Sequence, residues 1–326
     1  LQTQTQDQLE EKLKDFSVRL VLTAHPTQFY PGEVLGIIND LSKALNEENA
    51  ALINMYLQQL GKTPFLKKQK PSPYDEAVSL LWFMENVFYP ASGKILMTLK
   101  NTYTDLLNAK NPIIRMGFWP GGDRDGNPFV TADITLKVAA ALRRAIIRCY
   151  FIDVRHIKRR LTFKGVEEKI ADLERLLYAN LFVPDNSTNI TQQQMLSILS
   201  GARVTLIEQH NGLFLHLLDD MISKVEIFGV YFASLDVRQD SAVHVKLFDA
   251  IADSGGILPA DYKNLSEENR IKALENISLT ADISSISNDL LKDTLQCTQT
   301  IKTIQQLNGE EGCNRYIISQ CTSAAN

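Results

Sequence analysis

Two short polar segments carry side chains suited to chemistry in the first part of the chain. The first, TAHPTQ at 23–28, places His25 between hydroxyl residues, and Pro26 restricts the backbone that follows it. Histidine is the side chain that titrates near neutral pH, which makes His25 a candidate catalytic group. A structural histidine is the competing interpretation, because a lone histidine in a sequence more often has that role.

The second segment, GFWPGGDRDGNPFVTAD at 117–133, is rich in glycine and contains the alternating charges Asp123, Arg124 and Asp125. Flanking carboxylates would hold a guanidinium in one orientation, and a fixed arginine is suited to bidentate contact with a phosphate or carboxylate. Arg124 is therefore a candidate substrate-binding residue. The alternative is a tight connecting loop, which the glycine content also fits.

A third candidate is Arg238 in SLDVRQDSAVH, which directly follows an apolar stretch. Its neighbours Asp236, Gln239 and Asp240 are placed to orient its guanidinium. A structural salt bridge explains this segment equally well.

The elements that must position these residues are four short strands separated by long helical patterns. Strands are predicted where β-branched and aromatic residues concentrate, at 19–25, 113–119, 230–237 and 315–319. Apolar residues recur with helical spacing at 33–60, 75–110, 131–161, 165–181, 191–224 and 285–306. Gaps of roughly 80 to 110 residues between strands favour parallel pairing through helical crossovers.

The polar segments follow three of these strands directly, and in (β/α)8 barrels chemistry gathers at the carboxyl ends of the strands. The sequence therefore predicts an α/β barrel, predominantly helical by content, of which this chain supplies about four parallel strands. His25, Arg124 and Arg238 should then open at one end of the sheet, within roughly 15 Å of one another.

Composition narrows the class of protein. The 326 residues are 44% hydrophobic, enough to bury a core, and the net charge of −4 argues against a nucleic-acid partner. The sequence contains no apolar run long enough to span a membrane. Its four cysteines form no CxxC pair, so neither a zinc site nor a disulfide framework is expected. A cytoplasmic protein without a membrane or nucleic-acid partner is predicted.

Taken together, TAHPTQ, GGDRDGNP at 121–128 and LDVRQDS at 235–241 resemble the phosphoenolpyruvate carboxylase family, and RYIIS at 315–319 resembles a further strand of that family. The resemblance implies a (β/α)8 barrel wrapped by extra helices, with residues 1–326 as the amino-terminal portion of that single domain. It also implies a lyase that joins bicarbonate to phosphoenolpyruvate, giving oxaloacetate and phosphate. This is carbon dioxide fixation that feeds the tricarboxylic acid cycle.

The resemblance also implies roles for individual residues. His25 matches the family's proton acceptor, and Arg238 matches an arginine that holds the phosphoryl group. Arg124 is placed in the same substrate site. Other residues of the glycine-rich segment are expected to border the cavity, namely Trp119, Asp123 and Asn127. The family's Mg²⁺ or Mn²⁺ ligands have no counterpart in this chain, so the metal site is expected outside it.

Departures from the family mark a divergent branch. The family usually follows its histidine segment with glutamate and paired arginines, whereas Gln28-Phe29-Tyr30-Pro31-Gly32 stands here. Because the family's carboxyl-terminal half has no counterpart in this chain, we expect the chain to be an excised fragment that is inactive alone. The resemblance also implies that the full-length protein is a homo-oligomer. The alternatives are a non-enzymatic helical binding module derived from the family and phosphotransfer through His25.

Overall fold

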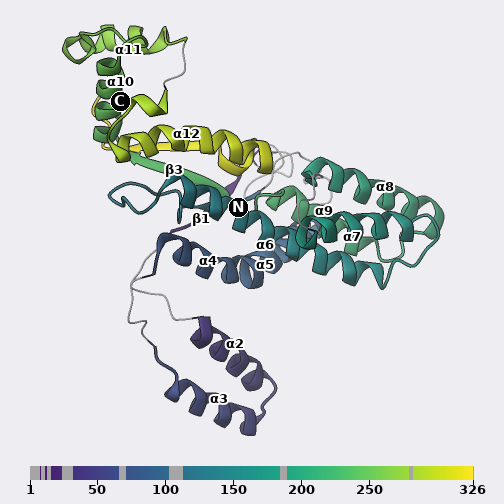
Figure 1. The fold of residues 1–326 in the computed structure, drawn as a ribbon. Helices are drawn as coiled ribbons and strands as arrows, with labels where there is room; N and C mark the ends of the chain where they lie inside the picture. The colour runs from purple at the N-terminus through teal and green to yellow at the C-terminus, as the bar shows by residue number, and fades with distance from the viewer. Residues whose placement is uncertain are drawn as a thin grey trace.

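A computed structural model describes residues 16–23, 32–65, 71–102, 113–183, 189–278 and 282–325, together with Gln8 and Lys12. His25 lies outside these residues. The described chain is mostly helical around one parallel sheet (Figure 1).

The sheet contains four strands in the order of the sequence, all parallel. They are β1 (Val18–Leu22), β2 (Ile114–Phe118), β3 (Ser234–Asp240) and β4 (Arg315–Ser319). The predicted parallel strands are therefore confirmed. The sheet is consistent with an α/β fold, and the closed barrel stays a prediction.

The third strand differs from its prediction at both ends. It begins at Ser234 instead of 230, because Phe232 adopts a left-handed backbone (φ 65°) and its amide donates to the carbonyl of Phe228 in a turn. It continues through Asp240, because Asp236–Asp240 pairs residue by residue with β4. Arg238 is thus inside a strand and not in the loop that follows it.

Helices fill the crossovers between the strands. Between β1 and β2 lie α2 (Gly32–Asn46), α3 (Ala50–Lys62), α4 (Pro73–Phe83), the π-helix η1 (Met84–Phe88) and α5 (Tyr89–Thr102). Between β2 and β3 lie α6 (Ala132–Lys158), α7 (Glu167–Phe182), α8 (Gln192–His210) and α9 (Leu215–Phe228). Between β3 and β4 lie α10 (Ser241–Ser254), α11 (Glu267–Glu275), α12 (Asp289–Asn308) and the short 3-10 helices η2 (Tyr262–Asn264), η3 (Ile283–Ser285) and η4 (Glu310–Cys313).

Two predicted helices are each divided in the structure. The pattern at 33–60 forms α2 and α3, which are separated where Glu48 has a left-handed backbone (φ 53°) and Asn49 caps α3. The pattern at 191–224 forms α8 and α9, because α8 ends at Asn211 in the left-handed conformation (φ 53°). Both breaks follow from backbone conformations that a helix interior does not allow.

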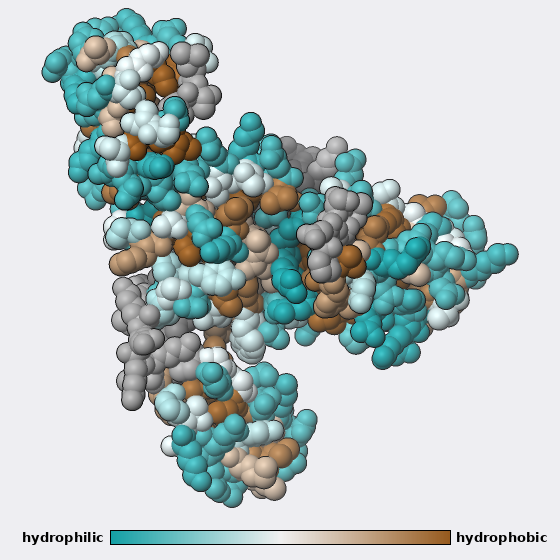
Figure 2. Space-filling model, viewed as in Figure 1, coloured by the Kyte–Doolittle hydropathy of each residue, from teal (hydrophilic) through white to brown (hydrophobic). Residues whose placement is uncertain are grey.

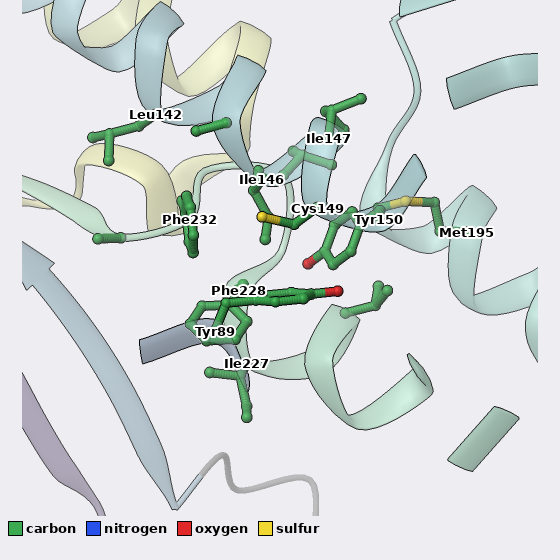
Figure 3. Packing of buried hydrophobic residues seen from close by; sticks show 14 of the residues in the cluster. Tyr89, Leu142, Ile146, Ile147, Cys149, Tyr150, Met195, Ile227, Phe228 and Phe232 are labelled. Carbon is green, nitrogen blue, oxygen red and sulfur yellow. The ribbon is translucent and has the colours of Figure 1, made fainter. Parts of the chain in front are cut away.

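The main hydrophobic core lies among β2, β3, α5, α6 and α9. Its centre holds the rings of Tyr89, Tyr150, Phe228 and Phe232, with Tyr89 5.5 Å from Phe228 and Phe228 5.4 Å from Phe232 between centroids (Figure 3). The hydroxyl of Tyr150 donates to the carbonyl of Gly229 at 2.8 Å, so its polar end is satisfied inside the core.

Other parts of the chain lie outside this core. A smaller hydrophobic cluster joins α10 to the segments around α11 and the start of α12. The α2–α3 hairpin extends away from the body, with apolar and polar residues mixed on its visible face (Figures 1 and 2). At the β1 edge of the sheet, Val18, Leu20 and Val21 are 43%, 42% and 37% exposed.

Candidate functional site

The glycine-rich loop, residues 119–131, leaves the end of β2 and lies against the end of β3. The amide of Arg124 donates to the carbonyl of Arg238, and the amide of Arg238 donates to the carbonyl of Gly122, both at 2.9 Å. A Cβ on Gly122 would stand 2.2 Å from the carbonyl oxygen of Asp236. Glycine at this position is what allows the loop to approach the strand so closely.

Arg238 has its guanidinium held by three side chains of this loop. Its Nη1 donates to Asp123 Oδ2 at 2.7 Å, and its Nη2 lies 3.8 Å from Asp125 Oδ2. The guanidinium carbon lies 4.1 Å from the centre of the Trp119 ring, a cation–π contact. The side chain remains 20% exposed. Arg238 is therefore fixed in orientation while one of its terminal nitrogens is held only by a distant carboxylate.

Asp236, two residues before Arg238 on β3, holds Arg19 and Trp119 on the same face of the sheet. Its fully buried carboxylate accepts from Arg19 Nη1 at 2.9 Å, from Arg19 Nη2 at 2.6 Å and from Trp119 Nε1 at 3.0 Å. This network joins β1, the end of β2 and β3. Because the indole N–H is anchored on Asp236, the ring face is presented to the guanidinium of Arg238.

The side chain of Arg124 points away from Arg238 and toward α12. It is 2% exposed, and its Nη2 donates to Asp293 Oδ2 on α12 at 2.6 Å. The expectation that Asp123 and Asp125 orient Arg124 is wrong, since both carboxylates face Arg238. The reason is the pairing with β3: Asp123 forms an isolated parallel bridge with Arg238, and successive side chains of extended backbone point to opposite faces.

The neighbours predicted to orient Arg238 are also used differently. Asp236 holds Arg19 and Trp119, and Asp240 accepts from the amide of Ala242 at 2.7 Å to cap α10. The salt bridge of Arg238 therefore comes from a segment more than a hundred residues earlier in the chain.

Burial affects the ionisation of this site. Desolvation raises the pKa of Asp123, and the nearby guanidinium of Arg238 lowers it again in part. The pair nevertheless stays in hydrogen-bond contact at 2.7 Å. The net effect is a raised pKa for Asp123, with the Arg238 guanidinium favouring its charged form.

A cleft of about 750 Å³ opens beside this network, between the end of β1, the start of α4 and the glycine-rich loop. Trp119, Asp123 and Asn127, the residues expected to border a cavity, all line it. Thr23, two residues before His25 in the sequence, lines it as well. Arg238 contacts three of the lining side chains, those of Trp119, Asp123 and Asp125, but neither Arg238 nor Arg124 lines the cleft itself.

The predicted clustering at one end of the sheet can be assessed for two of its three residues. Arg124 and Arg238 are joined through their backbones beyond the end of β2, while their guanidinium groups diverge. The position expected for His25 lies outside the described residues.

Among the described ranges, no group of three or more His, Cys, Asp and Glu side chains is arranged to hold a metal ion. In the same part of the chain, no helix combines the length and apolar character needed to cross a bilayer.

The whole chain matches the family model described as phosphoenolpyruvate carboxylase, through residues 1–181 and 166–326. The matched residues form the parallel sheet and the helices between its strands. They also include the ion pairs of Arg124 and Arg238 near the carboxyl end of the sheet. The chain belongs to the phosphoenolpyruvate carboxylase family.

Curated relatives carry the same name. The chain is 23% identical to a phosphoenolpyruvate carboxylase of Gloeobacter violaceus, with 98% of this chain and 41% of the relative covered. It is 25% identical to one of Synechococcus sp., with 96% and 37% covered, and 25% identical to one of Aeromonas salmonicida, with 83% and 36% covered. The chain thus spans about two-fifths of the length of these relatives, in agreement with an amino-terminal part.

Sequence reasoning missed Arg19, Asp236 as the anchor of Trp119, and Asp293. A signal existed for Arg19, because it is a charged residue in the otherwise apolar segment that forms β1. Asp293 gave none, because it is one of several polar residues on a long amphipathic helix.

Proposed function

We propose that the complete protein to which this chain belongs is a phosphoenolpyruvate carboxylase, which converts phosphoenolpyruvate and bicarbonate to oxaloacetate and phosphate. The single observation that carries the proposal is Arg238, a partly exposed arginine fixed at the carboxyl end of the sheet by Asp123 and Trp119. Family membership supplies the reaction, and the arginine supplies a group suited to its phosphoryl chemistry.

In this proposal Arg238 holds the phosphoryl group while it passes from phosphoenolpyruvate to bicarbonate. Asp123 uses one hydrogen of Nη1, whereas Nη2 is 3.8 Å from its nearest carboxylate oxygen. The Nη2 donors can therefore turn to a phosphoryl oxygen without loss of the Asp123 contact. Positive charge fixed in this way stabilises the charge that moves between oxygens in the transition state.

His25 is proposed as the proton acceptor of the second stage. Carboxyphosphate must lose a proton to release carbon dioxide beside the enolate, and a base placed near the end of β1 would accept it. Thr23, at the end of that strand, lines the cleft. The divalent metal of the family, Mg²⁺ or Mn²⁺, is proposed to bind ligands outside this chain.

Arg124 receives a different role from the one its sequence suggested. A side chain that is 2% exposed and paired with Asp293 is poorly placed to touch substrate. We propose that Arg124 supports the loop that carries Asp123 and Trp119.

Binding of phosphoenolpyruvate to the 326-residue chain tests the proposal directly. Calorimetry should show that Arg238→Gln weakens binding by at least about tenfold, since a charge-assisted contact to phosphate is worth about 1.5–3 kcal/mol. Arg175→Gln is the matched control, because that side chain is 78% exposed on α7. Equal affinity of the Arg238 and Arg175 variants would exclude Arg238 from substrate binding.

Activity provides a second test. Oxaloacetate formation, coupled to malate dehydrogenase, is expected from the complete protein and not from the 326-residue chain. In the complete protein, His25→Asn should abolish oxaloacetate formation and leave some bicarbonate-dependent hydrolysis of phosphoenolpyruvate. Unchanged turnover in that variant would remove His25 from the mechanism.

A further inference from the structure

Asp293 on α12 contacts the glycine-rich loop and the first residue that follows it. Its Oδ2 accepts from Arg124 Nη2 at 2.6 Å, in the middle of the loop. Its two oxygens lie 3.1 and 3.3 Å from the amide of Ala132, the first residue of α6, directly after the loop ends. One carboxylate therefore ties down both the centre and the far end of the loop.

The ion pair with Arg124 is the main compensation for a buried charge. Arg124 Nε and Nη1 are buried and have no hydrogen-bond partner among the described residues. Its contact with Thr294 Oγ1 is 3.4 Å long and weak, and its interaction with the buried Cys297 thiol supplies no full counter-charge. Because a buried guanidinium without a counter-ion is strongly unfavourable, loss of the Asp293 charge should drive Arg124 out of its place.

Movement of Arg124 should disturb the contacts that hold the guanidinium of Arg238. Asp123 and Asp125 flank Arg124 in the sequence and are the two carboxylates that face the Arg238 guanidinium. The amide of Arg124 also donates to the carbonyl of Arg238 at 2.9 Å. We therefore expect release of Arg124 from α12 to displace the loop backbone and, with it, the two carboxylates that hold Arg238.

We propose that Asp293 is a positioning residue for the phosphoryl-binding site: it holds the glycine-rich loop so that Asp123, Asp125 and Trp119 fix the guanidinium of Arg238. The inference rests on the proposed function for the role of Arg238. It adds a residue from α12, which belongs to none of the sequence segments that indicated the family.

Asp293→Asn is the test variant, because asparagine keeps the shape of the side chain and removes its charge. Asp289→Asn is the matched control: Asp289 is an exposed acidic residue in the first turn of the same helix. Hydrogen exchange of the amides of Asp123, Arg124 and Arg238 reports on the loop, and exchange in α7 and α8 reports on the rest of the fold.

For Asp293→Asn we expect exchange at the loop amides to be at least about tenfold faster, with exchange in α7 and α8 little changed, because the loop opens locally. Calorimetry should show phosphoenolpyruvate binding weakened by about tenfold, equivalent to about 1.4 kcal/mol. Asp289→Asn should match the wild type in both measurements. Unchanged loop exchange, or equally faster exchange throughout the chain, would refute the positioning role.

If Asp293→Asn fails to fold, Arg124→Met combined with Asp293→Leu replaces the ion pair by apolar groups that leave no charge buried. This double variant should fold, exchange its loop amides faster and bind phosphoenolpyruvate about tenfold more weakly. Binding equal to wild type would overturn the proposal.

The two proposals fail in different ways. If Arg238→Gln binds phosphoenolpyruvate as well as wild type, the proposed function of Arg238 fails, whereas loop exchange still decides whether Asp293 holds the loop. If Arg238→Gln weakens binding and Asp293→Asn changes neither exchange nor affinity, only the role of Asp293 is lost.

Discussion

Asp236→Asn tests the hydrogen-bond network in which Asp236 holds Arg19 and Trp119. Arg19 donates to both oxygens of Asp236, and Trp119 shares one of them. An asparagine amide in either orientation would point its NH₂ group at a donor, toward Arg19 Nη2 or toward Arg19 Nη1 and Trp119 Nε1. The substitution therefore removes a charge and creates a donor–donor conflict.

The expected magnitude follows from burial. Breaking a buried ion pair by altering one partner costs about 3–5 kcal/mol. The Asp236 side chain is fully buried, whereas that of Arg19 is 21% exposed and can recover some hydration. We therefore expect the free energy of unfolding to fall by about 3 kcal/mol, the lower end of that range. Asp172→Asn is the control, because the Asp172–Arg175 pair is largely exposed and should contribute less than about 1 kcal/mol.

Urea denaturation followed by circular dichroism measures the loss of stability, with an unchanged m-value as the sign that the denatured state is the same. The chain has two tryptophans, so fluorescence in a Trp82→Phe background reports on Trp119 alone. Acrylamide should quench Trp119 more strongly in the Asp236 variant, because the ring loses its anchor. A stability loss below about 1 kcal/mol with unchanged quenching would show that Asp236 does not organise this face.

Three further outcomes are expected. Gly122→Ala should lower the free energy of unfolding by about 3 kcal/mol, because its Cβ would stand 2.2 Å from the carbonyl oxygen of Asp236. The control Gly36→Ala should be neutral or stabilising, because no atom lies within 4 Å of its Cβ position on α2, and urea denaturation measures both variants. Burial, with a smaller contribution from Arg124, lowers the pKa of His244 from its usual 6.5. Stability should therefore fall as pH decreases from 6.5 toward that lowered value and level off above 6.5, and denaturation at several pH values should show a flatter profile for His244→Gln. The edges of β1 and β4 have no further strand among the described residues, so sedimentation should show association that grows with concentration. A monodisperse monomer at high concentration would contradict the interpretation that these four strands are part of a larger barrel.

The strands and their parallel order were predictable because their signals are local. Residues 113–119 and 315–319 match β2 and β4 closely, since β-branched and aromatic residues concentrate there and polar residues bound them. The start of β3 was misplaced because Val230 and Tyr231 have strand-like side chains, while the left-handed backbone at Phe232 is not visible in residue type. The breaks near Glu48 and Asn211 were missed for the same reason.

The closeness of the Arg124 and Arg238 backbones was predictable from the strand order, and the partners of their side chains were not. Sequence neighbours suggested that Asp123 and Asp125 would hold Arg124, but extended backbone sends neighbouring side chains to opposite faces. The choice between the two faces depends on the register with β3, where Asp123 bridges Arg238. Such a register is a long-range property, and no spacing within the loop encodes it.

Three arginines contact this network, and their carboxylate partners distinguish their roles. Arg19 uses both oxygens of Asp236, and Arg124 is buried against Asp293. Arg238 has one close carboxylate contact, a second at 3.8 Å, and a side chain that remains 20% exposed. An arginine that is already paired on both terminal nitrogens or sealed from solvent must break contacts before it binds an anion, whereas Arg238 need break none. The distribution of carboxylates, more than the presence of arginine, therefore supports the proposal that Arg238, and not Arg19 or Arg124, binds the phosphoryl group.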